Sequence, residues 1–385
     1  MKKVYISGIG PGPHGVSKLI EYLISKKTNV ICPKASPSLK SAEFLKIKAK
    51  IIFILRFFLD FIIFKARLTF LIIRGGMTPI IIHHHSIGLL YTYLIIKRFP
   101  TVYYYCVDSS FFCIKSYNQI NSNECILCAK GEQREKTCTS FPAKISPRLH
   151  DLIFKLMQSN YSKIKFLAQN KLQAELCFMS YPKSEVNVVG LATNDITEEV
   201  NMLNTKIQYN SLRDDEKKYM KDFFVYHGSP HEAKGFMTLF ENEENLSVPI
   251  LFPFSKKQAE DEIFKLQKKI KLPQHWVFES MRWDNGLKKA CNLAKGVICP
   301  SIWSAPIEGA FIKSLCVNNF VLIRPSSYSF YNEISTDIVI DFSKVSLNTI
   351  SKKIESFNIL QINSRREKIN KFLFNNFLVQ NSNFL

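Results

Sequence analysis

The sequence predicts an α/β protein of two doubly wound domains that face a cleft. Short apolar runs of strand length alternate with helical segments in both halves, as in parallel sheets covered by helices. Each half also opens with a strand, a glycine-containing loop and a helix, at residues 2–27 and 223–242. The length of 385 residues suits two hydrophobic cores better than one. We expect an N-terminal domain over 1–197, a polar linker, a C-terminal domain over 222–360 and a helical tail over 361–385.

Composition and charge narrow the class of partner. The net charge is +20, but the lysines are spread along the chain and no zinc-finger, RNA-recognition or basic-zipper pattern occurs. Nucleic acid is therefore not expected, whereas an anionic membrane surface or an anionic substrate is. The chain opens with a strand and not with a secretory signal, which predicts a cytoplasmic, reducing location. Ten cysteines in that setting indicate metal binding or buried thiols more than disulfides.

The first glycine-rich loop follows a short strand. Gly10, Gly12 and Gly15 allow tight turns and a close approach of the backbone to a ligand. Pro11 and Pro13 interrupt the spacing of a dinucleotide fingerprint. The loop is either a ligand-binding turn or a simple tight turn.

An unusually apolar helix is predicted around residues 51–64. Arg56 and Asp60 lie four residues apart, on one helix face, and further basic residues surround the run. The run is too short and too charged for a confident membrane span. It fits a helix lying in the interface of an anionic membrane, or a core helix whose Lys and Arg side chains reach to solvent.

Residues 296–323 form the most informative segment. A buried strand, Gly296 to Cys299, leads into a loop containing Ser301, and a helix begins at about Gly309. A second buried strand, Phe320 to Ile323, follows the helix. Where a loop connects a strand to the N-terminus of a helix, the helix presents its free N–H groups and the positive end of its dipole at the edge of the sheet. This geometry binds anions and suits a diphosphate, although an ordinary crossover would look the same.

The order of elements in this segment, with the run GSPHEAKGF at 228–236, resembles the donor site of GT-B glycosyltransferases of family 4. The resemblance implies two Rossmann-like domains and transfer of a hexose from a nucleotide sugar, with retention and without a catalytic metal. It implies a growing, lipid-linked surface glycan such as lipopolysaccharide or capsule as acceptor, met by a peripheral protein on the inner face of the membrane. Two alternatives stay open: a sugar-nucleotide epimerase or hydrolase, and an inactive scaffold that binds carbohydrate.

The resemblance assigns the donor-binding residues in the second half. Gly228, Lys234 and Gly235 match the element that clamps the donor diphosphate, and Ser229 stands where the family has Arg. Ser301 belongs to the matching loop before the helix.

The same loop departs from the family pattern at two glutamates. The family carries two Glu eight residues apart, and the aligned positions here are Ala305 and Lys313. Glu308, at the mouth of the helix, is expected to take over the first catalytic role. Lys313 is expected to contact a phosphate or carboxylate of the donor.

The resemblance also places the loop with Gly10, Gly12 and Gly15 at the mouth of the interdomain cleft, on the acceptor side.

Two further catalytic candidates lie in the first half. His83 to His85 follow a buried strand, and the run resembles the HxH of the family, which assigns His85 to sugar or acceptor binding. Alternate side chains of a strand share a face, so we expect His83 and His85 to point together and His84 to oppose them, with a metal pair as an alternative role. Asp108 matches the acid of the family's HD motif and could act as a general base, although Val107 replaces the family's His. Each of these residues could equally be structural.

A cysteine-rich loop follows Asp108. The pair Cys125 and Cys128 has zinc-knuckle spacing, and Cys113 and Cys138 could complete a four-sulfur site. Some family members carry a similar insert before a Tyr-Pro pair, where this chain has Phe141-Pro142. We expect a structural zinc ion, with an iron–sulfur cluster or unliganded thiols as alternatives.

Overall fold

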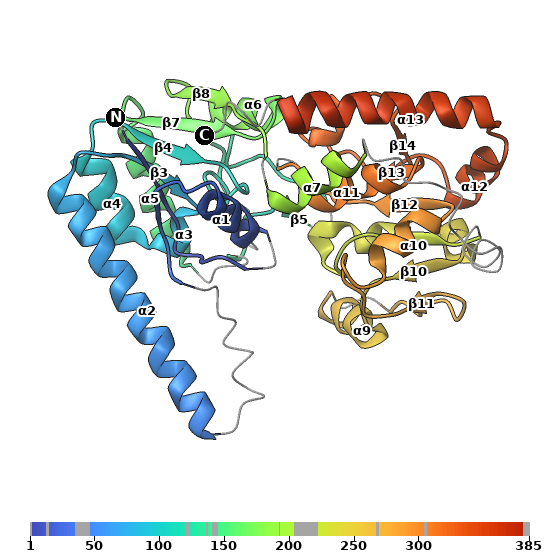
Figure 1. The fold of residues 1–385 in the computed structure, drawn as a ribbon, viewed down its shortest axis with the longest axis horizontal. Coiled ribbons are helices and arrows are strands. Elements are labelled where there is room, and N and C mark those ends of the chain that lie inside the picture. Colours follow the sequence, from blue (N-terminus) through green and yellow to red (C-terminus); the bar gives the residue numbers. More distant parts are fainter. Residues whose placement is uncertain are drawn as a thin grey trace. The chain divides into compact units, whose positions relative to one another are not determined.

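A computed structural model describes residues 2–12, 15–34, 47–120, 123–135, 138–140, 145–191, 193–203, 222–266, 269–303 and 306–379 (Figure 1). The chain divides into two compact units. The first comprises residues 1–116 and 127–194, and the second comprises residues 117–126 and 195–385. A ten-residue piece of the N-terminal half therefore belongs, by its contacts, to the second unit.

The first unit is built on a six-stranded parallel sheet with the order β2-β1-β3-β4-β7-β8. Its strands are β1 (Lys3–Ile6), β2 (Val30–Ile31), β3 (Thr78–Ile82), β4 (Val102–Tyr105), β7 (Ile164–Ala168) and β8 (Glu185–Val188). All five residues of β3 are buried, as expected for a central strand that helices cover on both sides. The carboxyl ends of these strands carry His83 and Asp108.

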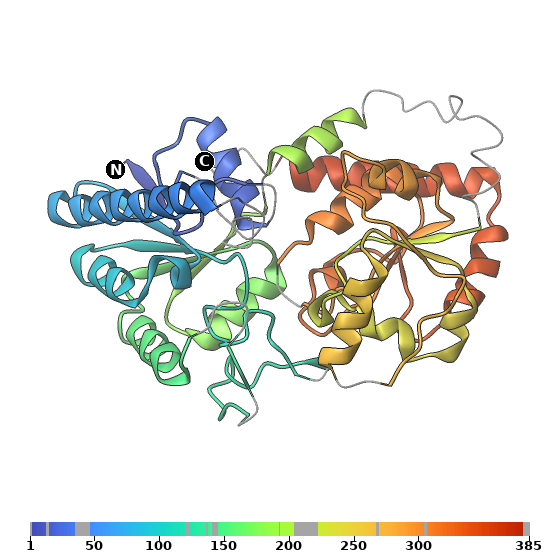
Figure 2. The ribbon, with the colours of Figure 1, turned by 90° about the horizontal axis from the view of Figure 1, so that it is seen from below.

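Helices connect the strands of the first unit. They are α1 (Val16–Ser25), α2 (Ile47–Arg74), α3 (His84–Ile87), α4 (Leu89–Arg98), α5 (Pro147–Ser159) and α6 (Lys171–Ser180). Ser146 caps α5 by accepting a hydrogen bond from the backbone N–H of Leu149. Helices α2, α4 and α5 pack side by side (Figure 2).

The second unit has its own six-stranded parallel sheet, with the order β11-β10-β9-β12-β13-β14. The strands are β9 (Phe224–Tyr226), β10 (Ile250–Phe252), β11 (Val277–Phe278), β12 (Gly296–Cys299), β13 (Val321–Ile323) and β14 (Val339–Asp341). A separate hairpin pairs β5 (Gln119–Ile120) with β6 (Asn123–Glu124). The strand order reverses beside β9 and β12, where ligands bind in open α/β sheets.

The helical elements of the second unit include α7 (Asn194–Met202), whose first residue still belongs to the first unit. The others are η3 (Glu232–Lys234), η4 (Phe236–Phe240), η5 (Glu243–Ser247), α9 (Lys256–Lys265), α10 (Leu287–Leu293), α11 (Gly309–Val317), η6 (Phe330–Glu333), α12 (Leu347–Glu355), α13 (Ile359–Leu373) and η7 (Phe374–Val379). The core of this unit is rich in aromatic residues, with Phe224, Tyr226, Phe236 and Phe252 fully buried. Their packing holds the loop after β9 in place.

The predicted α/β fold with parallel sheets is confirmed, and the strand, loop and helix expected at 296–323 are present. One alternative is corrected. The core-helix interpretation of residues 51–64 is wrong for most of the run, because Ile51, Leu55, Phe58 and Ile62 are each more than half exposed. Among the described residues, no helix combines the length and the apolar character needed to cross a membrane.

Candidate functional site

Two loops meet at the carboxyl edge of the second sheet. The Tyr226 hydroxyl, at the end of β9, lies between two carbonyl oxygens to which it can donate, that of Lys234 at 2.8 Å and that of Ser229 at 3.0 Å. Gly235 has a φ of +73°, and a Cβ at this position would lie 1.9 Å from the carbonyl oxygen of Pro300. Only glycine fits both the backbone conformation and the close approach. The loop after β9 is therefore seated against the loop after β12.

Further contacts hold the two loops together. The backbone N–H of Ile302 donates to the carbonyl oxygen of Ala233 at 3.2 Å, and Ser301 Oγ lies 3.3 Å from the same oxygen. Gly228 lies over the Tyr226 ring, where a Cβ would approach a ring carbon to 2.9 Å. The predicted residues Gly228, Gly235 and Ser301 therefore each make a contact that packs these loops: the two glycines allow close approaches, and Ser301 contacts the opposite loop.

A charged cluster forms where these loops meet. Lys234 Nζ lies 2.5 Å from Glu308 Oε1, and the two side chains are only 24% and 13% exposed. Ser301 Oγ donates to the same carboxylate oxygen at 2.9 Å. The Lys234 ammonium also lies 4.4 Å from the centre of the Trp303 ring, within the range of a cation–π contact. Lys234, Ser301 and Glu308, predicted from separate motifs, come together.

The helix α11 begins at this cluster. Glu308 is its N-cap residue, and its side chain does not accept from the helix backbone. The carboxylate instead faces Lys234 and Ser301. The first-turn N–H groups and the positive end of the helix dipole therefore lie beside a lysine ammonium and a hydroxyl. This arrangement can bind an anion such as a diphosphate.

Lys313 has a carboxylate partner within the second unit, and its contact with the donor stays a prediction. Its side chain is about nine-tenths buried and forms an ion pair with Asp195 of α7. Its ammonium also lies 5.5 Å from the centre of the Trp283 ring. In the structure, Asp195 is thus the carboxylate that Lys313 contacts, and sequence reasoning missed it. A residue 118 positions away leaves no local signal.

His227 is a second residue that sequence reasoning missed. It follows β9 directly, stacks on Trp283 with ring centres 5.1 Å apart, and shares a 2.8 Å hydrogen bond between Nδ1 and Ser314 Oγ. Burial, and then the positive charge of Lys313, lower the pKa of His227 to about 3. The imidazole is therefore neutral near pH 7 and acts as a hydrogen-bonding group. Its place directly after a strand could have revealed it.

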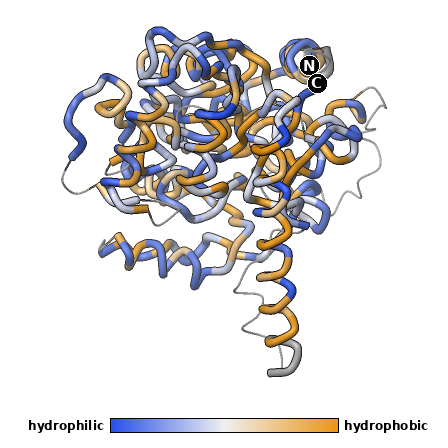
Figure 3. The backbone as a smooth tube through the Cα atoms, turned by 90° about the vertical axis from the view of Figure 1, so that its left-hand side faces the viewer, coloured by the Kyte–Doolittle hydropathy of each residue, from blue (hydrophilic) through white to orange (hydrophobic). Residues whose placement is uncertain are grey.

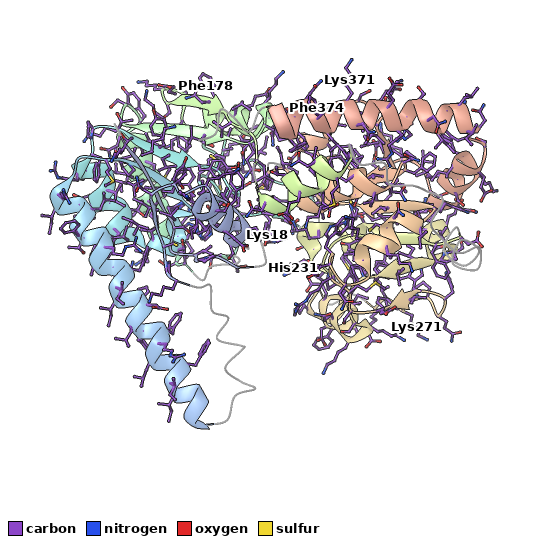
Figure 4. The ribbon with its side chains drawn as sticks, viewed as in Figure 1. Lys18, Phe178, His231, Lys271, Lys371 and Phe374 are labelled. Carbon is purple, nitrogen blue, oxygen red and sulfur yellow. The ribbon has the colours of Figure 1, made fainter. Side chains whose placement is uncertain are left out.

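The β5–β6 hairpin contributes aromatic and polar contacts to the second unit. Tyr117 packs edge-on against Trp303, with ring centres 4.5 Å apart, and lies 6.4 Å from His231, which Figure 4 labels. Gln119 Nε2 donates to Glu232 Oε2 at 3.1 Å. Tyr117 therefore contacts the same Trp303 ring over which the Lys234 ammonium lies.

In the first unit, the histidine run does not continue the strand as expected. β3 ends at Ile82, His83 adopts a left-handed conformation with φ of +58°, and His84 begins α3. The expected shared face of His83 and His85 is therefore wrong, because a turn replaces the pleat. His83 Nε2 lies 3.6 Å from Asp108 Oδ2, so His83 is the neighbour of the predicted acid. Asp108 Oδ1 accepts from the backbone N–H of Ser110 at 2.9 Å.

His85 lies within a group of histidines. Its ring centre is 4.0 Å from that of His84, 5.9 Å from that of His83 and 6.2 Å from that of His150. Burial, followed by the charges of His83 and His150, lowers the pKa of His85 to about 3. Neither ring nitrogen has a hydrogen-bond partner among the described residues. A neutral imidazole with two open nitrogens can bind hydroxyl groups but is a poor proton acceptor near pH 7.

The first glycine loop is positioned by a glycine outside the predicted three. The Gly8 N–H donates to Ser86 Oγ at 3.0 Å, and a Cβ on Gly8 would lie 2.0 Å from the Ser86 carbonyl oxygen. Gly10 is buried, Gly12 is half-buried, and Gly15 precedes α1 with a φ of +48°. The acceptor role of Gly10, Gly12 and Gly15 stays a prediction.

The four predicted metal ligands fall in both units. Cys113, Cys128 and Cys138 belong to the first unit, and Cys125 belongs to the second. Cys113 is buried and the other three are half-buried. Across the described ranges, no group of three or more His, Cys, Asp or Glu side chains could hold a metal ion. The zinc site stays a prediction, and Phe141-Pro142 lies outside the described residues.

Comparisons with known proteins reveal similarity in structure but not in sequence. No protein-family model matches the chain, and no curated protein matches it. A UDP-forming α,α-trehalose-phosphate synthase from Burkholderia vietnamiensis matches with a TM-score of 0.56 and 8% identity, over 100% of this chain and 95% of that one. Alr3699/HepE from Anabaena, solved in complex with UDP, matches with a TM-score of 0.56 and 10% identity, over 100% of this chain and 98% of that one.

Sucrose-phosphate synthase from Thermosynechococcus elongatus matches with a TM-score of 0.57 and 10% identity, over 98% of this chain and 95% of that one. Identities this low establish architecture and not activity. The two parallel sheets described above and these whole-chain matches lead to one conclusion: the chain has the GT-B fold.

Proposed function

We propose that this protein is a glycosyltransferase that moves a sugar from a nucleotide-sugar donor to a hydroxyl of a growing glycan. The cluster of Lys234, Ser301 and Glu308 beside the N-terminus of α11 carries the proposal. It combines an anion-binding helix end with a carboxylate in one place. Structural neighbours described as UDP-forming or solved with UDP support a nucleotide sugar as donor.

Lys234 and the α11 N-terminus hold the donor diphosphate in this proposal. An ammonium group has three N–H donors, so Lys234 can bind Glu308 and a phosphate oxygen at once. Ser301 adds a hydroxyl 2.9 Å from the same carboxylate. Gly228, Ser229 and Gly235 supply the loop that the diphosphate approaches, and Lys313, which forms an ion pair with Asp195, is a further donor-binding residue in this proposal.

Glu308 stabilises the reacting sugar in this proposal. Its contacts with Lys234 and Ser301 both use Oε1, which leaves Oε2 for a sugar hydroxyl or for the positive charge that develops on the ring. Replacement of Glu308 by Gln keeps the shape and removes the charge. We expect the variant to lose turnover far more than donor affinity, and equal losses in both would reduce Glu308 to a binding group.

The acceptor side belongs to the first unit in this proposal. His85, neutral and with two open nitrogens, binds a sugar hydroxyl, and Asp108 beside His83 orients or deprotonates the attacking hydroxyl. As in family 4, we propose retention at the transferred hexose and a lipid-linked surface glycan as acceptor. The protein would then work at the cytoplasmic face of a membrane.

One experiment separates this proposal from its two alternatives. The purified protein is incubated with a panel of nucleotide sugars, with and without a lipid-linked acceptor, and released nucleoside diphosphate is measured. Release that requires the acceptor supports the transferase. Release without acceptor supports a hydrolase or epimerase, and binding without release supports an inactive scaffold.

A further inference from the structure

Most of the helix α2 extends beyond the body of the first unit. Between residues 51 and 74 the buried side chains are Phe64, Leu68 and Leu71, which lie in the C-terminal half of the helix. The preceding turns project away from the sheet (Figure 1), and the side chains drawn on them point into open space (Figure 4). Figure 3 shows that this projecting part is strongly hydrophobic.

Nine of the ten exposed large apolar side chains between residues 51 and 74, all except Phe61, form one continuous surface. At 3.6 residues per turn they fall within an arc of about 140°, on the side of the helix opposite Phe64, Leu68 and Leu71. Seven of them, in the projecting part, are between 48% and 59% exposed. We call this surface the apolar arc, and it consists of Ile51, Ile52, Leu55, Phe58, Leu59, Ile62, Ile63, Phe70 and Ile73.

Basic side chains line both margins of the apolar arc. By the same helical geometry, Arg56, Arg67 and Arg74 follow one margin and Lys65 lies at the other. The Lys65 ammonium lies 4.3 Å from the centre of the Tyr91 ring. Between residues 51 and 74 the sequence has four basic residues and one acidic residue, Asp60, which lies outside the arc.

We propose that the apolar arc is a docking surface for an anionic phospholipid bilayer, with α2 lying in the plane of the interface. Apolar side chains enter the boundary between headgroups and acyl chains, and Arg56 and Arg74 reach the lipid phosphates. Lys65 and Arg67 instead donate to the backbone carbonyl oxygens of Ile87 and Val30. A second copy of this chain is a poorer occupant, because pairing two arcs would bring like-charged margins together. The inference rests on the proposed function in one respect only, that docking brings the enzyme to a lipid-linked acceptor.

Vesicle flotation of the full chain tests the proposal. Vesicles of phosphatidylcholine alone are compared with vesicles that also contain phosphatidylglycerol, at low and high salt. We expect binding to the anionic vesicles that weakens as salt rises, and little binding to the neutral ones. The double variant Arg56→Gln/Arg74→Gln should lower the anionic affinity by about fivefold for each residue removed.

A matched pair of triple variants locates the surface. Leu55→Gln/Leu59→Gln/Ile62→Gln changes the centre of the apolar arc, where all three side chains are already exposed, so folding is expected to survive. The control, Phe264→Gln/Ile359→Gln/Leu360→Gln, changes exposed apolar residues of the second unit. The arc variant should lose vesicle binding at an unchanged melting temperature, while the control keeps it.

Three results would overturn the proposal: equal binding by the arc and control variants, no preference for anionic vesicles, or a dimer that dissociates only in the arc variant. The proposed function is judged separately, by nucleotide release with an acceptor detached from its lipid. Vesicle binding without any release of nucleoside diphosphate would contradict the transferase proposal and support the docking surface. Release of nucleoside diphosphate without vesicle binding would support the transferase proposal and contradict the docking surface.

Discussion

Replacement of Lys234 by Ala probes the charged cluster directly. The pair with Glu308 spans 2.5 Å, and its side chains are 24% and 13% exposed, so it is neither a surface pair nor a fully buried one. Loss of such a pair should cost about 1–2 kcal/mol of the free energy of unfolding, between the surface and the buried ranges. A charge-assisted contact to a phosphate is worth ~1.5–3 kcal/mol, which predicts a loss of nucleotide affinity of about 10- to 150-fold.

Isothermal titration calorimetry with a panel of nucleoside diphosphates, beginning with UDP, measures the affinity, and thermal unfolding measures the stability. The matched control is Lys256→Ala, which removes a lysine whose 4.0 Å pair with Glu260 is 61% and 57% exposed. We expect this control to change neither quantity.

The double variant Lys234→Ala/Glu308→Gln separates binding from structure. Because it removes the unpaired carboxylate together with the ammonium, it should recover most of the lost stability but none of the lost affinity. Recovery of both would refute the reasoning, since Lys234 would then serve only to neutralise Glu308. Unchanged affinity in Lys234→Ala alone would also remove it from the site.

Three further predictions concern the backbone, pH and metal content. Gly235→Ala should lower the free energy of unfolding by roughly 1–3 kcal/mol through backbone strain, and by more because the new Cβ meets the Pro300 carbonyl oxygen. Gly131 has a similar φ but open space around it, so Gly131→Ala should show the strain alone. Chemical denaturation of the two variants compares these losses. His227 stays neutral when folded, with a pKa of about 3, so its contribution to stability is complete above the unfolded pKa of about 6.5 and falls as pH drops from 6.5 towards 3. Between pH 7 and pH 5 the loss should be about 2 kcal/mol, and a His227→Phe variant whose unfolding shows the same pH dependence as the wild type would contradict the assignment. Elemental analysis should find about one zinc ion per chain, bound by Cys113, Cys125, Cys128 and Cys138. A metal-free preparation that is fully active would contradict this prediction.

The local architecture could be read from the sequence because its signals are local. The buried run Gly296–Cys299, the loop with Ser301 and the helix from Gly309 follow from residues that are neighbours in the chain. A strand that leads into a helix N-terminus presents free N–H groups that can bind an anion, so the proposed chemistry of the site comes from the same segment.

Distant contacts required the tertiary structure. Glu308 meets Lys234 across 74 residues and Asp195 meets Lys313 across 118, and neither pairing has a periodic or spacing signal. The hairpin at 117–126 joins the second unit although its neighbours on both sides belong to the first.

The histidine run shows the limit most clearly. An apolar strand followed by three histidines predicts alternating faces, but a single left-handed residue, His83, ends the strand and turns the chain into α3. One backbone dihedral therefore decided which histidine stands beside Asp108. Side chains alternate between the two faces only as long as the strand continues, and no residue in this run indicates where the strand ends.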